Sequence, residues 1–137
     1  MIAVDTNVLV RLYVDPVNAN ESDVQRKKAI TLFKSESAIY VPITVILELA
    51  WVMRSFYEFS AQNLRDVLAH LTGLPNVEVE HWAEVNSAAE LACKGFDIAD
   101  VLHALLSVHT EAFVTFDDKK LVRRAKRLGV LSHVRTL

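Results

Sequence analysis

The chain has little of what marks several large classes of protein. Its 137 residues include one cysteine, three glycines and three prolines. A lone cysteine excludes an intramolecular disulfide framework and is consistent with a reducing cytosol. The shortage of glycine and proline, together with 52% hydrophobic residues, excludes a disordered chain. We therefore expect one globular domain over residues 1–137, which is long enough to form a proper core.

Targeting and membrane signals are also missing from the sequence. The apolar start has no basic region and already contains Asp5. The most apolar segment, residues 41–53, contains Pro42 and Glu48 and is too short to cross a bilayer. These absences predict a soluble, cytoplasmic protein without a membrane partner.

The net charge of −2 does not identify a nucleic-acid-binding protein, but the charge is unevenly distributed. Residues 119–135 contain no acid and carry these cations: Lys119, Lys120, Arg123, Arg124, Lys126, Arg127 and Arg135. A solvated helix face would explain them. A basic face beside an acidic pocket would instead suit a phosphate-rich polymer held next to a metal.

The pattern of apolar residues predicts short strands that alternate with helices. We expect strands at residues 2–4, 39–41, 77–79, 112–115 and 130–134. We expect helices at about residues 6–14, 23–35, 44–59, 61–71, 82–94, 98–109 and 119–127, and a polar loop at 17–22. Thr6 or Asn7 is the expected cap of the first helix, and Ser60 that of the fourth. Strands alternating with helices favour an α/β fold, in which helices cover both faces of a parallel sheet.

Four acids from distant parts of the sequence are expected at one edge of this sheet. Two of them, Asp5 and Asp117, directly follow strands, and the other two, Glu48 and Asp100, lie early in helices. Right-handed crossovers bring strand ends and the starts of the following helices to a shared edge. Open α/β sheets bind their ligands at that edge.

Two of the predicted helices are apolar except for a single polar stripe. Residues 43–53 have only Thr44 and Glu48 as polar residues, four positions apart and therefore on one face. The helix at 98–109 is similar, with its stripe formed by Asp100, His103 and Ser107. Asp97 is better placed to cap this helix, which leaves Asp100 for a functional site. His103 would contact the substrate or a carboxylate there, or have a structural role.

The residue types at this edge favour a hard divalent cation. Four carboxylates that lie close together need a counter-charge to stay ionised. Oxygen ligands without cysteine suit Mg²⁺ or Mn²⁺ rather than zinc. Such an ion activates a water molecule and stabilises charge on a phosphate oxygen, so the cluster favours hydrolysis of phosphodiesters.

Each acid also has a simpler explanation. Asp5 alone would cap the first helix, and Glu48 alone would lie at the boundary of a partly exposed helix. Asp100 alone would complement a helix dipole, and Asp117 alone would be a turn residue. A shared metal site differs from these separate explanations because it accounts for all four acids and both polar stripes together.

The segments that contain the acids resemble a known family. They are IAVDTNVLVRL, LEL, GFDIADVLHA and VTFDDKKL. In this order they resemble PIN-domain ribonucleases, in particular the VapC-type toxins of toxin–antitoxin pairs, over essentially the whole chain. The resemblance implies a three-layer α/β/α fold with a central five-stranded parallel sheet. It also implies a Mg²⁺- or Mn²⁺-dependent endoribonuclease that forms a homodimer and is inhibited by a cognate antitoxin protein.

The resemblance assigns roles to particular residues. The acids that match the family's catalytic and metal-binding positions are Asp5, Glu48, Asp100 and Asp117. The supporting residues are Asn7, Thr115, Asp118 and His103, with Asp118 as a helix cap or an outer partner of the site. The candidates for contact with the RNA backbone are Lys119, Lys120, Arg123, Arg124 and Arg127.

Three other functions remain as alternatives. A phosphotransfer enzyme of the haloacid-dehalogenase type expects a second aspartate two residues after the first, where this chain has Asn7. A receiver domain expects adjacent acids after the first strand and a lysine after the last one, and neither is evident. A non-catalytic metal-binding interaction module with a PIN-like fold would retain the same acids, so the sequence does not separate it from the enzyme.

Overall fold

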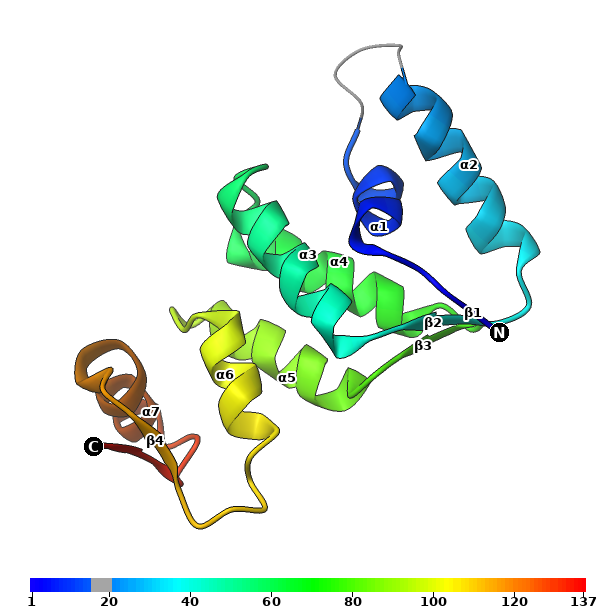
Figure 1. The fold of residues 1–137 in the computed structure, drawn as a ribbon. Helices are drawn as coiled ribbons and strands as arrows, with labels where there is room; N and C mark the ends of the chain where they lie inside the picture. Colours follow the sequence, from blue (N-terminus) through cyan, green and yellow to red (C-terminus); the bar gives the residue numbers. More distant parts are fainter. Residues whose placement is uncertain (16–20) are drawn as a thin grey trace. The chain divides into compact units, whose positions relative to one another are not determined.

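The computed structural model describes residues 1–15 and 21–137. The predicted loop at 17–22 lies mostly outside these residues. The described chain divides into two compact units, Met1–Trp82 and Ala83–Leu137 (Figure 1). No helix in the described part is both long enough and apolar enough to cross a membrane.

The first unit contains a parallel sheet of three strands in the order β1-β2-β3. The strands are β1 (Ile2–Ala3), β2 (Ile39–Val41) and β3 (Val77–Val79). Between them in the chain are the helices α1 (Thr6–Tyr13), α2 (Glu21–Ser35), α3 (Ile43–Ser55) and α4 (Ala61–Gly73) (Figure 1). Because the strands are parallel, Asp5, Pro42 and Glu80 all lie where the strands end, at one edge of this sheet.

Helical periodicity explains the buried faces of α3 and α4. The buried side chains of α3 recur every three or four residues: Ile46, Leu49, Ala50 and Met53. Those of α4 follow the same rule: Leu64, Leu68 and Leu71. The expected cap at Ser60 is confirmed, because its side chain and that of Asn63 form a reciprocal capping box.

The second unit contains two paired strands and the last helices of the chain (Figure 1). Its helices are α5 (Trp82–Ala92), which begins at the last residue of the first unit, α6 (Ile98–Leu105), the π-helical turn η1 (Asp118–Val122) and α7 (Arg123–Leu128). The strands β4 (Phe113–Thr115) and β5 (Val134–Thr136) pair in parallel, with Phe113 opposite Val134 and Thr115 opposite Thr136.

The five expected strands are present, but the expected single five-stranded sheet is not confirmed. The strands form one sheet of three and another of two. A local pattern of apolar residues identifies a strand, whereas the choice of its neighbour depends on tertiary packing. Strands of two or three residues offer few backbone pairs that would specify that choice.

Two expected boundaries in the C-terminal part were wrong. The last strand was expected at 130–134 but lies at Val134–Thr136. Gly129 and Leu131 both have positive φ, 68° and 51°, so the backbone turns where the strand was expected. The helix expected at 98–109 ends at Leu105, and the hydroxyl of Ser107 donates a hydrogen bond to the carbonyl of His103.

Candidate active site

Asp5 follows β1 and caps α1. Its backbone is extended (φ −88°, ψ 165°), and its Oδ1 accepts a hydrogen bond of 2.7 Å from the backbone N–H of Thr6. The side chain is exposed, and Oδ2 makes no hydrogen bond or ion pair with any described residue. The cap of α1 is therefore Asp5 rather than Thr6 or Asn7, because the helix begins at Thr6, and this role leaves one carboxylate oxygen of Asp5 for a ligand.

Thr6, which was expected only as a possible helix cap, lies beside this carboxylate. It is only 4% exposed, and its Oγ1 has no hydrogen-bond partner among the described residues. A buried hydroxyl without a partner costs about 1–3 kcal/mol, so such atoms are rare and call for an explanation. A polar ligand or an ordered water at this end of α1 would provide the partner.

Glu48 lies on the polar stripe expected for α3. Glu48 and Thr44 are both exposed, whereas Ile46 and Leu49 are buried. The carboxylate makes no hydrogen bond or ion pair with a described residue. The exposed position also agrees with the simpler explanation of a boundary residue.

Glu80 was missed by the sequence analysis. It accepts hydrogen bonds from the hydroxyl of Tyr40 (2.6 Å) and from the backbone N–H of Ile43 (3.1 Å). These bonds lower the pKa of the Glu80 carboxyl, and the bond from Tyr40 to this carboxylate raises the pKa of Tyr40. Pro42, the N-cap of α3, has no capping side chain, so Glu80 stabilises the start of the helix that carries Glu48. Its position directly after β3 was the signal that would have identified it.

Asp100 is the acid whose charge the fold disfavours most clearly. Asp97 caps α6 by accepting a hydrogen bond of 3.1 Å from the backbone N–H of Asp100, as expected. Asp100 itself is half-buried, and burial raises the pKa of its carboxyl. The negative charges of Asp97 and Asp117 raise this pKa further, whereas His103 lowers it. Asp100 and Asp117, which are distant in sequence, therefore lie close enough to repel each other.

Asp117 has the capping role that was expected of Asp118. Asp117 accepts a hydrogen bond of 2.9 Å from the backbone N–H of Lys120, and its own N–H donates to the hydroxyl of Thr115 (3.0 Å). Asp118 instead forms an ion pair with Arg123 (2.7 Å) and accepts a hydrogen bond from Thr136. The expectation that Asp118 caps this helix was wrong, because the chain turns one residue earlier into a π-helical turn. Turns of this kind are frequent at functional sites.

The basic residues near the C-terminus separate into two groups. Arg124 donates a hydrogen bond to the carbonyl of Gly95 and lies over the ring of Phe96, 5.8 Å from its centre. Arg123 pairs with Asp118 as described above. The exposed cations of this stretch that form no ion pair with a described residue are Lys119, Lys120, Lys126, Arg127 and Arg135.

His103 and Asn7, two of the supporting residues, are both exposed. The His103 ring stacks on Phe113, with ring centres 6.5 Å apart and an angle of 18° between the planes. His103 lies near enough to Asp100 to lower the pKa of that carboxyl. Asn7 lies in the first turn of α1 and contributes to a pocket between α1 and α2.

The predicted site residues are divided between the two units. Asp5, Asn7 and Glu48 belong to the first unit. The second unit contains Asp100, His103, Thr115, Asp117 and Asp118. Within the described residues of either unit, no three side chains of His, Cys, Asp or Glu form a group that would hold a metal ion.

Comparison with known proteins identifies the family. The profile of the PIN domain matches residues 2–127, which span both units, and the chain therefore belongs to the PIN domain family. PIN domains are generally nuclease folds that cleave RNA with the help of divalent metal ions. A search among curated proteins finds no match.

The donor atoms present fit such an ion. Mg²⁺ and Mn²⁺ prefer carboxylate oxygens and retain several waters, so they do not need a closed cage of protein ligands. The pKa of Asp100 is raised by burial and then by neighbouring negative charge, and a cation would offset the latter. The unpartnered hydroxyl of Thr6 beside Asp5 is consistent with an ordered polar ligand at that position.

Proposed function

We propose that the chain is a Mg²⁺- or Mn²⁺-dependent endoribonuclease in which Asp5, Glu48, Asp100 and Asp117 serve one reaction. The family match carries this proposal, since it extends over all four acids. The mutual repulsion of Asp100 and Asp117 supports it. We also propose that residues 1–137 act as one domain, because the family match crosses the boundary between the two units.

A bound metal ion would supply an activated water and stabilise negative charge on the phosphate. Asp5, Asp100 and Asp117 would hold such an ion. The exposed carboxylate of Glu48 ligates the ion or orients the attacking water, and Glu80 fixes the start of its helix. Thr115 orients Asp117 through the backbone hydrogen bond described above.

Contact with the RNA backbone is assigned mainly to the unpaired cations of the second unit. Lys119 and Lys120 lie in η1, the turn that Asp117 caps, and Arg127 lies in α7. Arg123 already pairs with Asp118, and Arg124 with the carbonyl of Gly95. We therefore assign these two arginines a supporting rather than a direct role in RNA binding.

A role as the toxin of a type II toxin–antitoxin system rests on the sequence resemblance. It implies a cytoplasmic homodimer and a cognate antitoxin protein. Co-expression with the product of a small adjacent reading frame tests this role. We expect co-purification of the two proteins and loss of nuclease activity, whereas independent behaviour of the two would contradict it.

The nuclease activity is tested by RNA cleavage with and without Mg²⁺ or Mn²⁺. Asp5→Asn and Asp100→Asn represent the two units, and Glu111→Gln, an exposed acid of the second unit, is the matched control. We expect cleavage by the wild type and Glu111→Gln only when the metal is present, and little or none by the other two variants. Cleavage by folded Asp5→Asn and Asp100→Asn at the wild-type rate would refute the proposal.

A further inference from the structure

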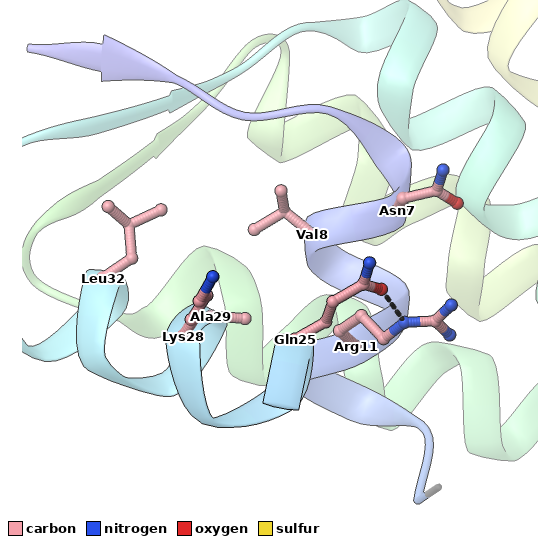
Figure 2. A pocket seen from close by; sticks show the side chains of 7 residues that line it. All are labelled: Asn7, Val8, Arg11, Gln25, Lys28, Ala29 and Leu32. Carbon is pink, nitrogen blue, oxygen red and sulfur yellow. Dashed lines mark hydrogen bonds between the residues drawn. The ribbon is translucent and has the colours of Figure 1, made fainter. Parts of the chain in front are cut away.

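A pocket of about 510 Å³ lies between α1 and α2 in the first unit (Figure 2). Its lining residues are Asn7, Val8, Arg11, Gln25, Lys28, Ala29 and Leu32. This α1–α2 pocket falls within the range of sites that bind small molecules or single residues of a polymer. The residues from α2 stand at positions i, i+3, i+4 and i+7, so they share one helix face.

The lining of the α1–α2 pocket combines cations, amides and apolar side chains, and it includes no acid. Arg11 donates from Nε to Oε1 of Gln25 (2.7 Å), which links α1 to α2 and leaves the terminal nitrogens of Arg11 without a described partner (Figure 2). Lys28 is exposed and forms no ion pair with a described residue. Its neighbour Lys27, by contrast, pairs with Asp23 at 3.3 Å. The pocket therefore presents two available positive charges.

The pocket lies on the same helix as a proposed metal ligand. Asp5 caps α1, Asn7 lies in the first turn, and Arg11 follows Asn7 by four residues on the same face. Four residues of an α-helix extend about 6 Å. A strand that is cut beside Asp5 would thus meet the pocket at Asn7, and the positive charge of Arg11 one helical turn further along α1.

We propose that the α1–α2 pocket binds a nucleotide of single-stranded RNA adjacent to the scissile phosphate, with Arg11 and Lys28 contacting its phosphate. This inference rests on the proposed nuclease function. Proteins bind single-stranded RNA through cations that follow the backbone and through polar groups that reach base edges. The amide of Asn7 provides such a polar group, and Val8, Ala29 and Leu32 provide an apolar surface for the base. The amide of Gln25 is instead engaged by Arg11 and Glu21.

The test measures binding of a fluorescently labelled single-stranded RNA oligonucleotide to the full chain in EDTA, where metal-dependent cleavage is absent. We expect each of Arg11→Ala and Lys28→Ala to weaken binding about 3- to 10-fold, and the double variant more strongly. The dependence of log Kd on log salt concentration should become less steep by about one unit per lost phosphate contact. Lys34→Ala is the matched control, because Lys34 is an exposed lysine of α2 outside the pocket and should bind RNA like the wild type.

A second variant and a second probe keep the test decisive. Arg11→Lys retains the charge and should restore part of the affinity, and circular dichroism verifies that every variant is folded. Equal affinities for the pocket variants and Lys34→Ala would overturn the inference. It would also be overturned if an acidic polyglutamate peptide bound in a pocket-dependent manner while RNA binding did not depend on the pocket.

Failure of this inference is distinguishable from failure of the proposed function. If the wild type cleaves RNA and the pocket variants keep its KM and its RNA affinity, the inference fails and the nuclease function stands. If the wild type never cleaves RNA but the pocket variants weaken its binding to RNA, the nuclease function fails and the pocket remains an RNA-binding site.

Discussion

The acids of the two units differ in how the surrounding structure treats their charge. In the first unit, Asp5 and Glu48 are exposed. In the second unit, Asp100 is half-buried and lies near Asp97 and Asp117, so its ionised form is disfavoured. In the second unit, a half-buried carboxylate lies beside other negative charges, and a divalent cation would relieve their repulsion. In the first unit, the carboxylate oxygens of Asp5 and Glu48 are accessible to a ligand.

Replacing Asp100 should give the largest effect on function. Asp100→Asn removes the charge that a metal would neutralise, and we expect RNA cleavage to fall by about 100-fold or more. The same variant should be more stable than the wild type in EDTA, because it no longer buries a charge beside two other acids. Cleavage assays and denaturant unfolding check both parts. Lower stability of Asp100→Asn together with unchanged cleavage would contradict the difference proposed between the acids of the two units.

The largest effect on stability is expected from a glycine of the second unit. Gly95 has φ +102°, and a Cβ added there would lie 3.2 Å from the Arg124 guanidinium carbon. Gly95→Ala should therefore lower the free energy of unfolding by about 1–3 kcal/mol. Gly73→Ala in the first unit is the matched control, because no atom lies within 4 Å of its Cβ position. Denaturant titration should find that variant close to the wild type, and similar losses for the two would contradict the prediction.

Lowering the pH should change the contributions of Glu80 and Asp100 to stability in opposite directions. The pKa of Glu80 is lowered from its ordinary value of 4.5, so its contribution to stability is present above that value and is lost as the pH falls through the folded-state pKa. The pKa of Asp100 is raised from 3.8, so Asp100 lowers stability only above that value. This loss of stability is absent below pH 3.8 and grows as the pH rises to the folded-state pKa. Unfolding in EDTA between pH 7 and pH 2 measures both effects.

Two substitutions separate these contributions. Relative to the wild type, Glu80→Gln should be less stable at pH 7, and the deficit should shrink as the pH falls below 4.5. Asp100→Asn should be more stable at pH 7, and the gain should disappear below about pH 3.8. If the stabilities of the two variants relative to the wild type changed with pH in the same direction, the predicted difference between Glu80 and Asp100 would be wrong.

The smallest effects are expected from the exposed cations. Lys120→Ala should weaken RNA binding by a few-fold without changing stability, because Lys120 is exposed and forms no ion pair with a described residue. Arg124→Ala should instead lower stability, since it removes the contacts with Gly95 and Phe96. Fluorescence anisotropy and thermal unfolding of the two variants provide the comparison. A loss of stability in Lys120→Ala would contradict the assignment.

The local features of the fold could be predicted from the sequence. The capping roles of Ser60 and Asp97 follow from short-range chemistry, and both are confirmed. The polar stripe with Thr44 and Glu48 follows from the helical period and is exposed as expected. The grouping of the strands into sheets was not predictable in this way, because it depends on contacts between segments that are distant in the sequence.

The errors and omissions concern choices between neighbouring residues and long-range hydrogen bonds. Asp117 and Asp118 are both competent caps, and only the π-helical turn selects Asp117. The role of Glu80 depends on Tyr40 in an adjacent strand, which no local pattern specifies. The raised pKa of Asp100 depends first on its burial and then on the nearby charges of Asp97 and Asp117, and the sequence supplied the proximity of Asp117 only as an expectation.

Calorimetric titration with Mn²⁺ tests most directly whether the four acids serve one metal-dependent reaction. The wild type and Glu111→Gln should bind the ion equally, whereas Asp5→Asn in the first unit and Asp100→Asn in the second should each weaken binding at least 10-fold. Binding of Mn²⁺ with wild-type affinity by both folded carboxylate variants would contradict the account.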